Sequence, residues 1–162
     1  MFLQKKPGFP EVIKKEKGIT FLILTLYDAG GKQLSRNTYW MSPGHDFNGL
    51  HQMPSASLNI KAQPKPSAPA SSKNFSPAEY ASWTVTIKNT SDKLAFFLNP
   101  QLIKDGEEVL PSYWSDNYFS IPPGETITTT VSCPKAMIKA IAPELRLEGW
   151  NITQQNIPLV TH

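Results

Sequence analysis

From residue 55 onward, the chain consists largely of short runs in which apolar and polar residues alternate. The alternation is clearest at Trp83, Val85 and Ile87, which are separated by threonines. A period of two places every second side chain on the same face of a strand, so each run predicts a strand with one buried face. The runs lie at residues 55–62, 80–88, 94–103, 108–110, 113–121, 126–132 and 144–152.

Turn-forming residues separate these runs. Asp105-Gly106 is a typical hairpin turn, and Pro122-Pro123-Gly124 stands between two of the runs. Seven strands at this spacing, within about a hundred residues, predict an all-β, immunoglobulin-like antiparallel sandwich. We expect the Pro-, Ser- and Ala-rich residues 64–72 to form an extended loop inside it. Residues 135–142 are expected to form one helical turn or a short strand.

A separate β-hairpin is predicted before the sandwich. Residues 19–27 are apolar at both parities, Asp28–Gly31 supplies glycines for a tight turn, and residues 34–41 return as the second strand. Apolar side chains on both faces predict that both faces are buried or that one meets a partner domain. Because two strands alone are only marginally stable in water, we interpret the hairpin as the remainder of a preceding sandwich domain. The predicted division is therefore 1–54, hairpin and linker, and 55–162, immunoglobulin-like domain.

The composition of the chain limits the classes of binding partner that we expect. The net charge is +3, from 16 basic and 13 acidic residues, and no nucleic-acid motif accompanies the N-terminal lysines. No apolar run reaches the length of a transmembrane segment, and the N-terminus lacks a signal peptide, so neither a nucleic acid nor a membrane is expected as a partner. Cellular location stays open, since a periplasmic or secreted parent protein is compatible with the chain. Cys133 is the only cysteine, which excludes an internal disulfide, and we expect it to be partly buried and unreactive.

The acidic residues form no evident catalytic pair. Hydrolysis of a glycosidic bond needs two carboxyl groups that flank one site, whereas most acidic residues here lie in predicted turns or on polar strand faces. Asp116 is flanked by aromatic residues, and the favoured interpretation is that its side chain hydrogen-bonds the local turn. The three histidines lack the spacing of a zinc site, and no glycine-rich loop precedes a helix. We therefore expect no catalytic residue, no metal site and no cofactor in the chain.

Aromatic residues are the remaining candidates for binding, because their faces stack on sugar rings and also pack at domain contacts. The candidates for contact with a sugar or a neighbouring domain are Trp114, Asp116, Asn117 and Tyr118. Trp83 and Trp150 are expected to pack in the core or between domains.

Four segments resemble the C-terminal region of glycoside hydrolase family 2 enzymes of the β-mannosidase and exo-β-D-glucosaminidase type. They are Tyr27–Trp40 (YDAGGKQLSRNTYW), Trp114–Ser120 (WSDNYFS), Pro123–Glu125 (PGE) and Gly149–Asn151 (GWN). The resemblance covers nearly the whole chain and implies that its two parts are the tail of the penultimate sandwich and the terminal sandwich. In that family the acid/base and nucleophile glutamates belong to a TIM barrel of about 250 residues. No segment here resembles the barrel, so none of those residues is carried over.

The hypothesis from the sequence is a non-catalytic accessory sandwich of a β-mannosidase-like glycoside hydrolase. It would contact the neighbouring domains of a parent enzyme that needs no cofactor. The alternative is a carbohydrate-binding module in which Trp114 and Tyr118 form a stacking platform for an oligosaccharide. A third hypothesis, a free-standing scaffold domain, is disfavoured because half a sandwich would leave an exposed apolar edge.

Overall fold

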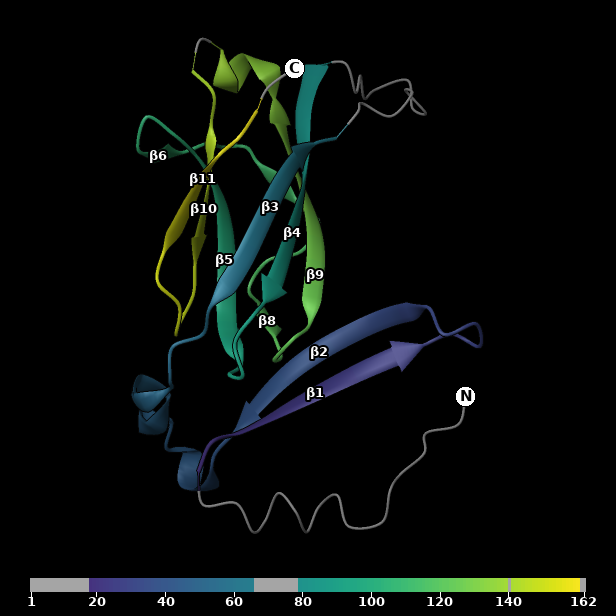
Figure 1. Ribbon diagram of the computed structural model, residues 1–162, viewed down its shortest axis with the longest axis vertical. Helices are drawn as coiled ribbons and strands as arrows, with labels where there is room; N and C mark the ends of the chain where they lie inside the picture. The colour runs from purple at the N-terminus through teal and green to yellow at the C-terminus, as the bar shows by residue number, and fades with distance from the viewer. Residues whose placement is uncertain (1–17, 66–78, 140, 161–162) are drawn as a thin grey trace. The chain divides into compact units, whose positions relative to one another are not determined.

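Figure 1 shows the computed structural model, which describes residues 18–65, 79–139 and 141–160. The chain divides into two compact units at the boundary between Met53 and Pro54. Strands joined by turns, loops and short 3-10 segments make up both units, and the described residues contain no α-helix. The prediction of an all-β fold is therefore confirmed.

The first unit contains the predicted hairpin. Strand β1 (Thr20–Tyr27) pairs antiparallel with β2 (Gln33–Met41), with Thr20 opposite Met41. The Asp28 carboxylate orders the turn, since its Oδ1 accepts hydrogen bonds of 2.9 Å from the backbone N–H groups of Gly30 and Lys32. Gly31 has a φ of 81°, a conformation that glycine adopts without steric cost.

The remainder of this unit, residues 42–53, winds through two 3-10 segments, η1 (Pro43–His45) and η2 (Asn48–Gln52). On the hairpin itself, Leu24 and Leu26 are each about half exposed, and so is Tyr39 on the paired strand. These three side chains share one face, because Leu22 lies opposite Tyr39 in the register and alternate residues point the same way. One face of the hairpin therefore keeps a large exposed apolar area.

The second unit is a sandwich of two antiparallel sheets (Figure 1). One sheet has four strands in the order β3 (Leu58–Pro64), β4 (Tyr80–Asn89), β9 (Thr126–Pro134) and β7 (Tyr113–Trp114). The other has the order β11 (Gln155–Pro158), β10 (Glu144–Glu148), β5 (Ala95–Lys104) and β6 (Glu107–Glu108), with β8 (Phe119–Ile121) also paired to β5. The four-stranded sheet and the β11-β10-β5 part of the other sheet have the strand orders of a constant-type immunoglobulin domain, with β6 and β8 as additional strands. The predicted fold class is therefore confirmed.

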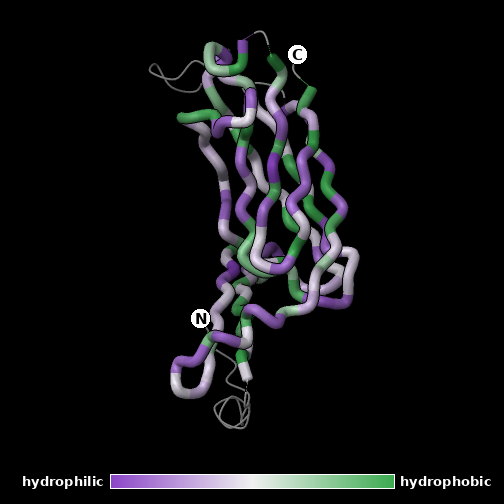
Figure 2. Tube along the Cα trace, turned by 90° about the vertical axis from the view of Figure 1, so that its left-hand side faces the viewer, coloured by the Kyte–Doolittle hydropathy of each residue, from purple (hydrophilic) through white to green (hydrophobic). Residues whose placement is uncertain are grey.

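The core lies between the sheets and follows the predicted alternation. Figure 2 shows hydrophobic and hydrophilic residues alternating along the long strands. From β4 the side chains of Trp83, Val85 and Ile87 point inward and are at most 1% exposed, and from β10 Leu145 and Leu147 are fully buried. The indole N–H of Trp83 donates a 2.8 Å hydrogen bond to the carbonyl oxygen of Val160, so this large residue is buried without an unpaired donor.

The strand expected over 113–121 is wrong. It consists of two short strands in different sheets, because β7 pairs with β9 whereas β8 pairs with β5. Residues 115–118 cross from one sheet to the other. Ser115, Asp116 and Asn117 favour turns, and their effect outweighs the strand preference of the aromatic residues around them.

The strand expected over 144–152 is also wrong in its second half. Strand β10 ends at Glu148, residues 149–152 turn, and β11 follows as an additional strand. A smaller difference concerns β3, which begins at Leu58. Within residues 135–142, Lys135–Ile138 form the 3-10 segment η4, which agrees with the predicted helical turn. The loop predicted over 64–72 lies beyond Lys65 outside the described residues.

Candidate functional site

The crossing segment, residues 115–118, is held against β9 by a set of short hydrogen bonds. The Ser115 N–H donates to the carbonyl oxygen of Thr130 at 2.9 Å, and the Ser115 hydroxyl accepts from the Thr130 N–H at 2.9 Å. That hydroxyl lies 3.0 Å from the hydroxyl of Thr129, which in turn donates to the carbonyl oxygen of Asp116 at 3.0 Å. Because Thr129 is only 1% exposed, the segment is fixed to the interior of the sandwich.

Tyr118 ends this segment in an uncommon backbone conformation. Its φ is 52°, and Phe97, which lies in a bulge of β5, has a φ of 55°. Bulky residues rarely adopt positive φ because the side chain crowds the backbone. The two rings nevertheless lie together, with centroids 5.1 Å apart and an interplanar angle of 44°. Tyr118 is 52% exposed and Phe97 is 37% exposed, so the pair presents an aromatic surface to solvent.

The structure does not bring together all the residues predicted for this site. Trp114 lies on β7, is partly buried and packs against the core, and its indole nitrogen has no hydrogen-bond partner among the described residues. Asp116, Asn117 and Tyr118 are exposed in the crossing segment. Tyr118 therefore pairs with Phe97, a residue that the sequence did not single out for binding.

The expectation for Asp116 is wrong in its details. Its backbone carbonyl, and not its carboxylate, takes part in the hydrogen bonding of the segment. Within the part of the chain that the structure describes, the carboxylate itself has no hydrogen-bond or ion-pair partner. It is left as an exposed negative charge two residues from Tyr118.

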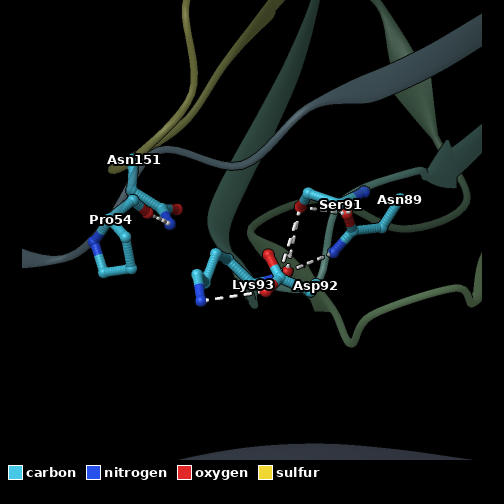
Figure 3. A network of polar contacts seen from close by, with 6 residues as sticks. All are labelled: Pro54, Asn89, Ser91, Asp92, Lys93 and Asn151. Carbon is cyan, nitrogen blue, oxygen red and sulfur yellow. Dashed lines mark hydrogen bonds and ion pairs between the residues drawn. The ribbon is translucent and has the colours of Figure 1, made fainter.

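The turn at 149–152 combines a close contact with a polar network. A Cβ on Gly149 would lie 2.5 Å from Cδ2 of the buried Leu98, so only glycine fits at this position without a shift. Asn151 is 7% exposed, and its Oδ1 accepts from the Phe96 N–H at 2.9 Å. Its Nδ2 donates at 2.8 Å to the carbonyl oxygens of Pro54 (Figure 3) and Leu94.

Trp150 lies between Gly149 and Asn151 in the chain, and its exposed fraction is 46%. Its backbone N–H donates to the carbonyl oxygen of Phe96 at 3.0 Å, and Phe96 directly precedes Phe97 in the chain. The indole ring of Trp150 is therefore not buried in the sandwich core, and its packing against a further domain stays a prediction.

Asn89 forms a second buried network, which sequence reasoning missed. It is fully buried, and Figure 3 shows its side chain beside Ser91 and Lys93. Its Nδ2 donates to the carbonyl oxygens of Lys93 at 2.7 Å and Ile121 at 2.8 Å, while its Oδ1 accepts from Ser91. In the same turn, the hydrogen bond and charge of Lys93 lower the pKa of Asp92, at an Nζ–Oδ2 distance of 3.0 Å. Asn89 reads as an ordinary turn residue in the sequence, since its partner Ile121 is 32 residues away.

The thiol of Cys133 belongs to the hydrophobic core of the sandwich. Burial raises the pKa of the Cys133 thiol to about 11, so the thiol stays protonated and unreactive at neutral pH. Cys133 is fully buried, more than the sequence predicted. Over the described ranges, no three His, Cys, Asp or Glu side chains gather as metal ligands would. The same residues include no helix with the length and hydropathy of a membrane span.

A groove of about 350 Å³ lies on the outer face of the four-stranded sheet. Its lining residues are Asn59, Lys61, Thr86, Lys88, Thr90 and Thr126. Lys61 lies opposite Thr86 and Lys88 opposite Asn59, so the two lysines are diagonal neighbours on adjacent strands. Because β3 is an edge strand, Lys61 also suits the common role of a charge that prevents edge-to-edge pairing.

Comparison with known proteins gives a consistent picture. The sequence profile of the family described as exo-beta-D-glucosaminidase Ig-fold domain matches residues 37–152. The exo-beta-D-glucosaminidase of Streptomyces avermitilis is 34% identical over 149 residues, which are 83% of this chain and 16% of the relative. The mannosylglycoprotein endo-beta-mannosidase of Lilium longiflorum is 36% identical over 80 residues, or 44% of this chain and 8% of the relative.

Among solved structures, the exo-chitosanase CsxA of Amycolatopsis orientalis is similar with a TM-score of 0.71 and 29% sequence identity. The similarity covers 85% of this chain and 18% of that protein. The chain thus spans less than a fifth of the length of each of these relatives.

Proposed function

The chain belongs to the family of exo-β-D-glucosaminidase Ig-fold domains, and from this membership we propose that it is a non-catalytic accessory domain of a longer glycoside hydrolase. The parent enzyme would release glucosamine-type sugars from an oligosaccharide, as the names of the relatives suggest. Residues 1–54 would be part of a neighbouring sandwich, and 55–162 an immunoglobulin-like domain. The domain would contribute contacts with other parts of the parent enzyme.

One observation carries the non-catalytic role. A glycosidase needs a carboxylic acid whose pKa is raised by a protected environment, so that it can donate a proton to the leaving group. The buried polar residues of the described chain are Asn89, Ser120, Thr129 and Asn151, and none of them carries a carboxyl or imidazole group. Three of the four, Asn89, Thr129 and Asn151, are occupied in holding backbone carbonyls. The interior is therefore suited to maintaining the fold and not to proton transfer.

The exposed hairpin face supports a role inside a larger protein. Leu24, Leu26 and Tyr39 are each about half exposed on one face of β1–β2. A complete preceding sandwich would cover such a face with a second sheet, and free monomeric proteins rarely leave it open.

The test is an activity assay of the purified 162-residue chain. We expect no hydrolysis of an aryl β-D-glucosaminide or an aryl β-mannoside, under conditions in which the exo-beta-D-glucosaminidase of Streptomyces avermitilis is active. Turnover that co-purifies with the chain and disappears in Asp116→Asn would contradict the proposal. So would turnover that is unaffected by the substitution but stays with the chain through successive purification steps, since a contaminating enzyme would separate from the chain in those steps.

A further inference from the structure

The aromatic pair of Phe97 and Tyr118 is the feature that the scaffold role leaves unexplained. Both residues adopt positive φ, of 55° and 52°, which glycine or asparagine would adopt with less strain. A strained backbone that carries an exposed large side chain is a reason to look for a function of that side chain. Neither ring is buried in the core, so core packing does not account for the pair.

The surroundings hold the pair in place without a ligand. Tyr118 follows the crossing segment that Ser115 and Thr129 fix to β9. The backbone of Phe97 is also held in place, since its N–H donates to the hydroxyl of the buried Ser120 at 3.2 Å. A platform that is already ordered loses little conformational entropy when it binds a ligand.

A charge two residues before Tyr118 in the chain indicates the class of ligand. The Asp116 carboxylate is exposed and lacks a partner among the described residues, and the exposed Asn117 adds an amide. Aromatic rings stack on the apolar face of a sugar ring, an amide hydrogen-bonds hydroxyl groups, and a carboxylate attracts an ammonium group. We propose that Tyr118, Phe97 and Asp116 bind a saccharide that carries a protonated amino group.

The inference deepens the proposed function, since an amino-sugar site outside the catalytic domain would hold the polymer near the active site of the parent enzyme. It also revises the platform expected from the sequence, because Trp114 lies on the other sheet and Phe97 takes its place. Contact with a protein domain through the same rings is the competing explanation, and the experiment separates the two.

The experiment is a titration of the ¹⁵N-labelled chain with a glucosamine tetramer, followed by amide NMR shifts. We expect saturable shifts at residues 97 and 115–118, and weaker binding of the N-acetylglucosamine tetramer. Tyr118→Gly should weaken binding of the glucosamine tetramer at least about tenfold, because it removes the ring. Glycine suits the positive φ at this position, so the variant keeps the fold. Tyr118→Phe should retain binding.

Two control variants make the outcome specific. Tyr113→Ala removes a tyrosine that is 54% exposed on the four-stranded sheet, and it should change the affinity less than about twofold. Asp116→Asn should remove the preference for glucosamine over N-acetylglucosamine, whereas Asp105→Asn, in the β5–β6 turn, should leave it intact.

Several results would overturn the inference. They are the absence of saturable shifts at residues 97 and 115–118, equal binding by the Tyr118→Gly variant, or an unchanged sugar preference in Asp116→Asn. Either of the first two results would assign the rings to a protein contact, and the third would show that the Asp116 carboxylate does not recognise the amino group. The proposed function has a separate readout, the hydrolysis assay, and could stand if the sugar titration failed.

Discussion

Replacing Asn151 by alanine is the most informative perturbation of the sandwich. The side chain connects segments that are remote in sequence, since its amide reaches the carbonyl oxygens of Pro54, 97 residues away, and Leu94, 57 residues away. Its Oδ1 also accepts the hydrogen bond of the Phe96 N–H. Truncation removes all three bonds together and leaves three backbone groups without their partner.

The magnitude follows from the burial of those groups. A buried polar group left unsatisfied costs about 1–3 kcal/mol, whereas one that water can reach costs less. The bond from Phe96 is buried, and the two bonds from the amide are partly buried. We therefore expect the free energy of unfolding to fall by about 2–4 kcal/mol, a large share of the roughly 5–15 kcal/mol of a typical domain.

Two further variants serve as controls for this test, one at an exposed asparagine and one at position 151 itself. Asn156→Ala removes an exposed side chain that bonds only Glu144 and Gln154, so its effect should be below about 0.5 kcal/mol. Asn151→Asp keeps an acceptor for the Phe96 N–H but turns a negative oxygen toward two carbonyl oxygens. It should therefore be destabilised at neutral pH and should recover partly when the carboxylate is protonated in acid.

The assay is urea unfolding followed by the amide NMR signals of β4 and β10, which report on the sandwich alone. The reasoning is refuted if Asn151→Ala lies within about 0.5 kcal/mol of Asn156→Ala with an unchanged denaturant slope. That result would mean that water or a local shift replaces the three hydrogen bonds at little cost.

Four other predictions concern packing and the thiol. Gly149→Ala should lower the free energy of unfolding by about 1–3 kcal/mol in the same urea assay, because the new Cβ meets Leu98. Leu147→Ala should cost about 2–5 kcal/mol through the cavity it leaves, and a loss below 1 kcal/mol would contradict full burial. The folded Cys133 thiol holds its proton more tightly than the unfolded one, so stability should fall as pH rises from 9.0 to about 11, and Cys133→Ala should remove that part of the decline. The same thiol should react with a disulfide reagent at pH 8 only in urea, which an absorbance assay of the released thiolate checks.

Most of the sandwich could be predicted because its signals are local. Alternation around Trp83 and Leu145 depends on side chains two residues apart, and it correctly identified the buried faces of β4 and β10. The turns at Asp28 and Asp105 are likewise set by residues within the turn. Such features depend on residues close in the sequence and not on distant parts of the chain.

The features that could not be predicted depend on distant partners. Asn89 and Asn151 look like ordinary turn residues, and their importance comes from carbonyl groups that only the completed fold brings near. The crossing at 115–118 is similar, since the choice of two sheets for β7 and β8 depends on pairing with β9 and β5. The positive φ of Phe97 accompanies a bulge in β5, and the sequence of β5 contains no residue pattern that predicts this bulge.

The candidate site was therefore only partly predictable. Tyr118 and Asp116 stood out because aromatic and acidic residues adjoin there, and both are exposed. Their assumed companion Trp114 is packed against the core, and Phe97 is the ring that lies beside Tyr118. Trp114 lies on β7 of one sheet, whereas Tyr118 directly precedes β8 of the other sheet, so their nearness in the chain misled the choice of partner.

The size of the natural protein that contains this chain tests the central claim most directly. Antibodies raised against the sandwich should detect, in the source cells or their medium, a polypeptide several-fold larger than the 18.1 kDa of this chain, and that polypeptide should co-purify with exo-glycosidase activity. A mature product of 18.1 kDa, without a larger precursor or associated hydrolase activity, would contradict the account.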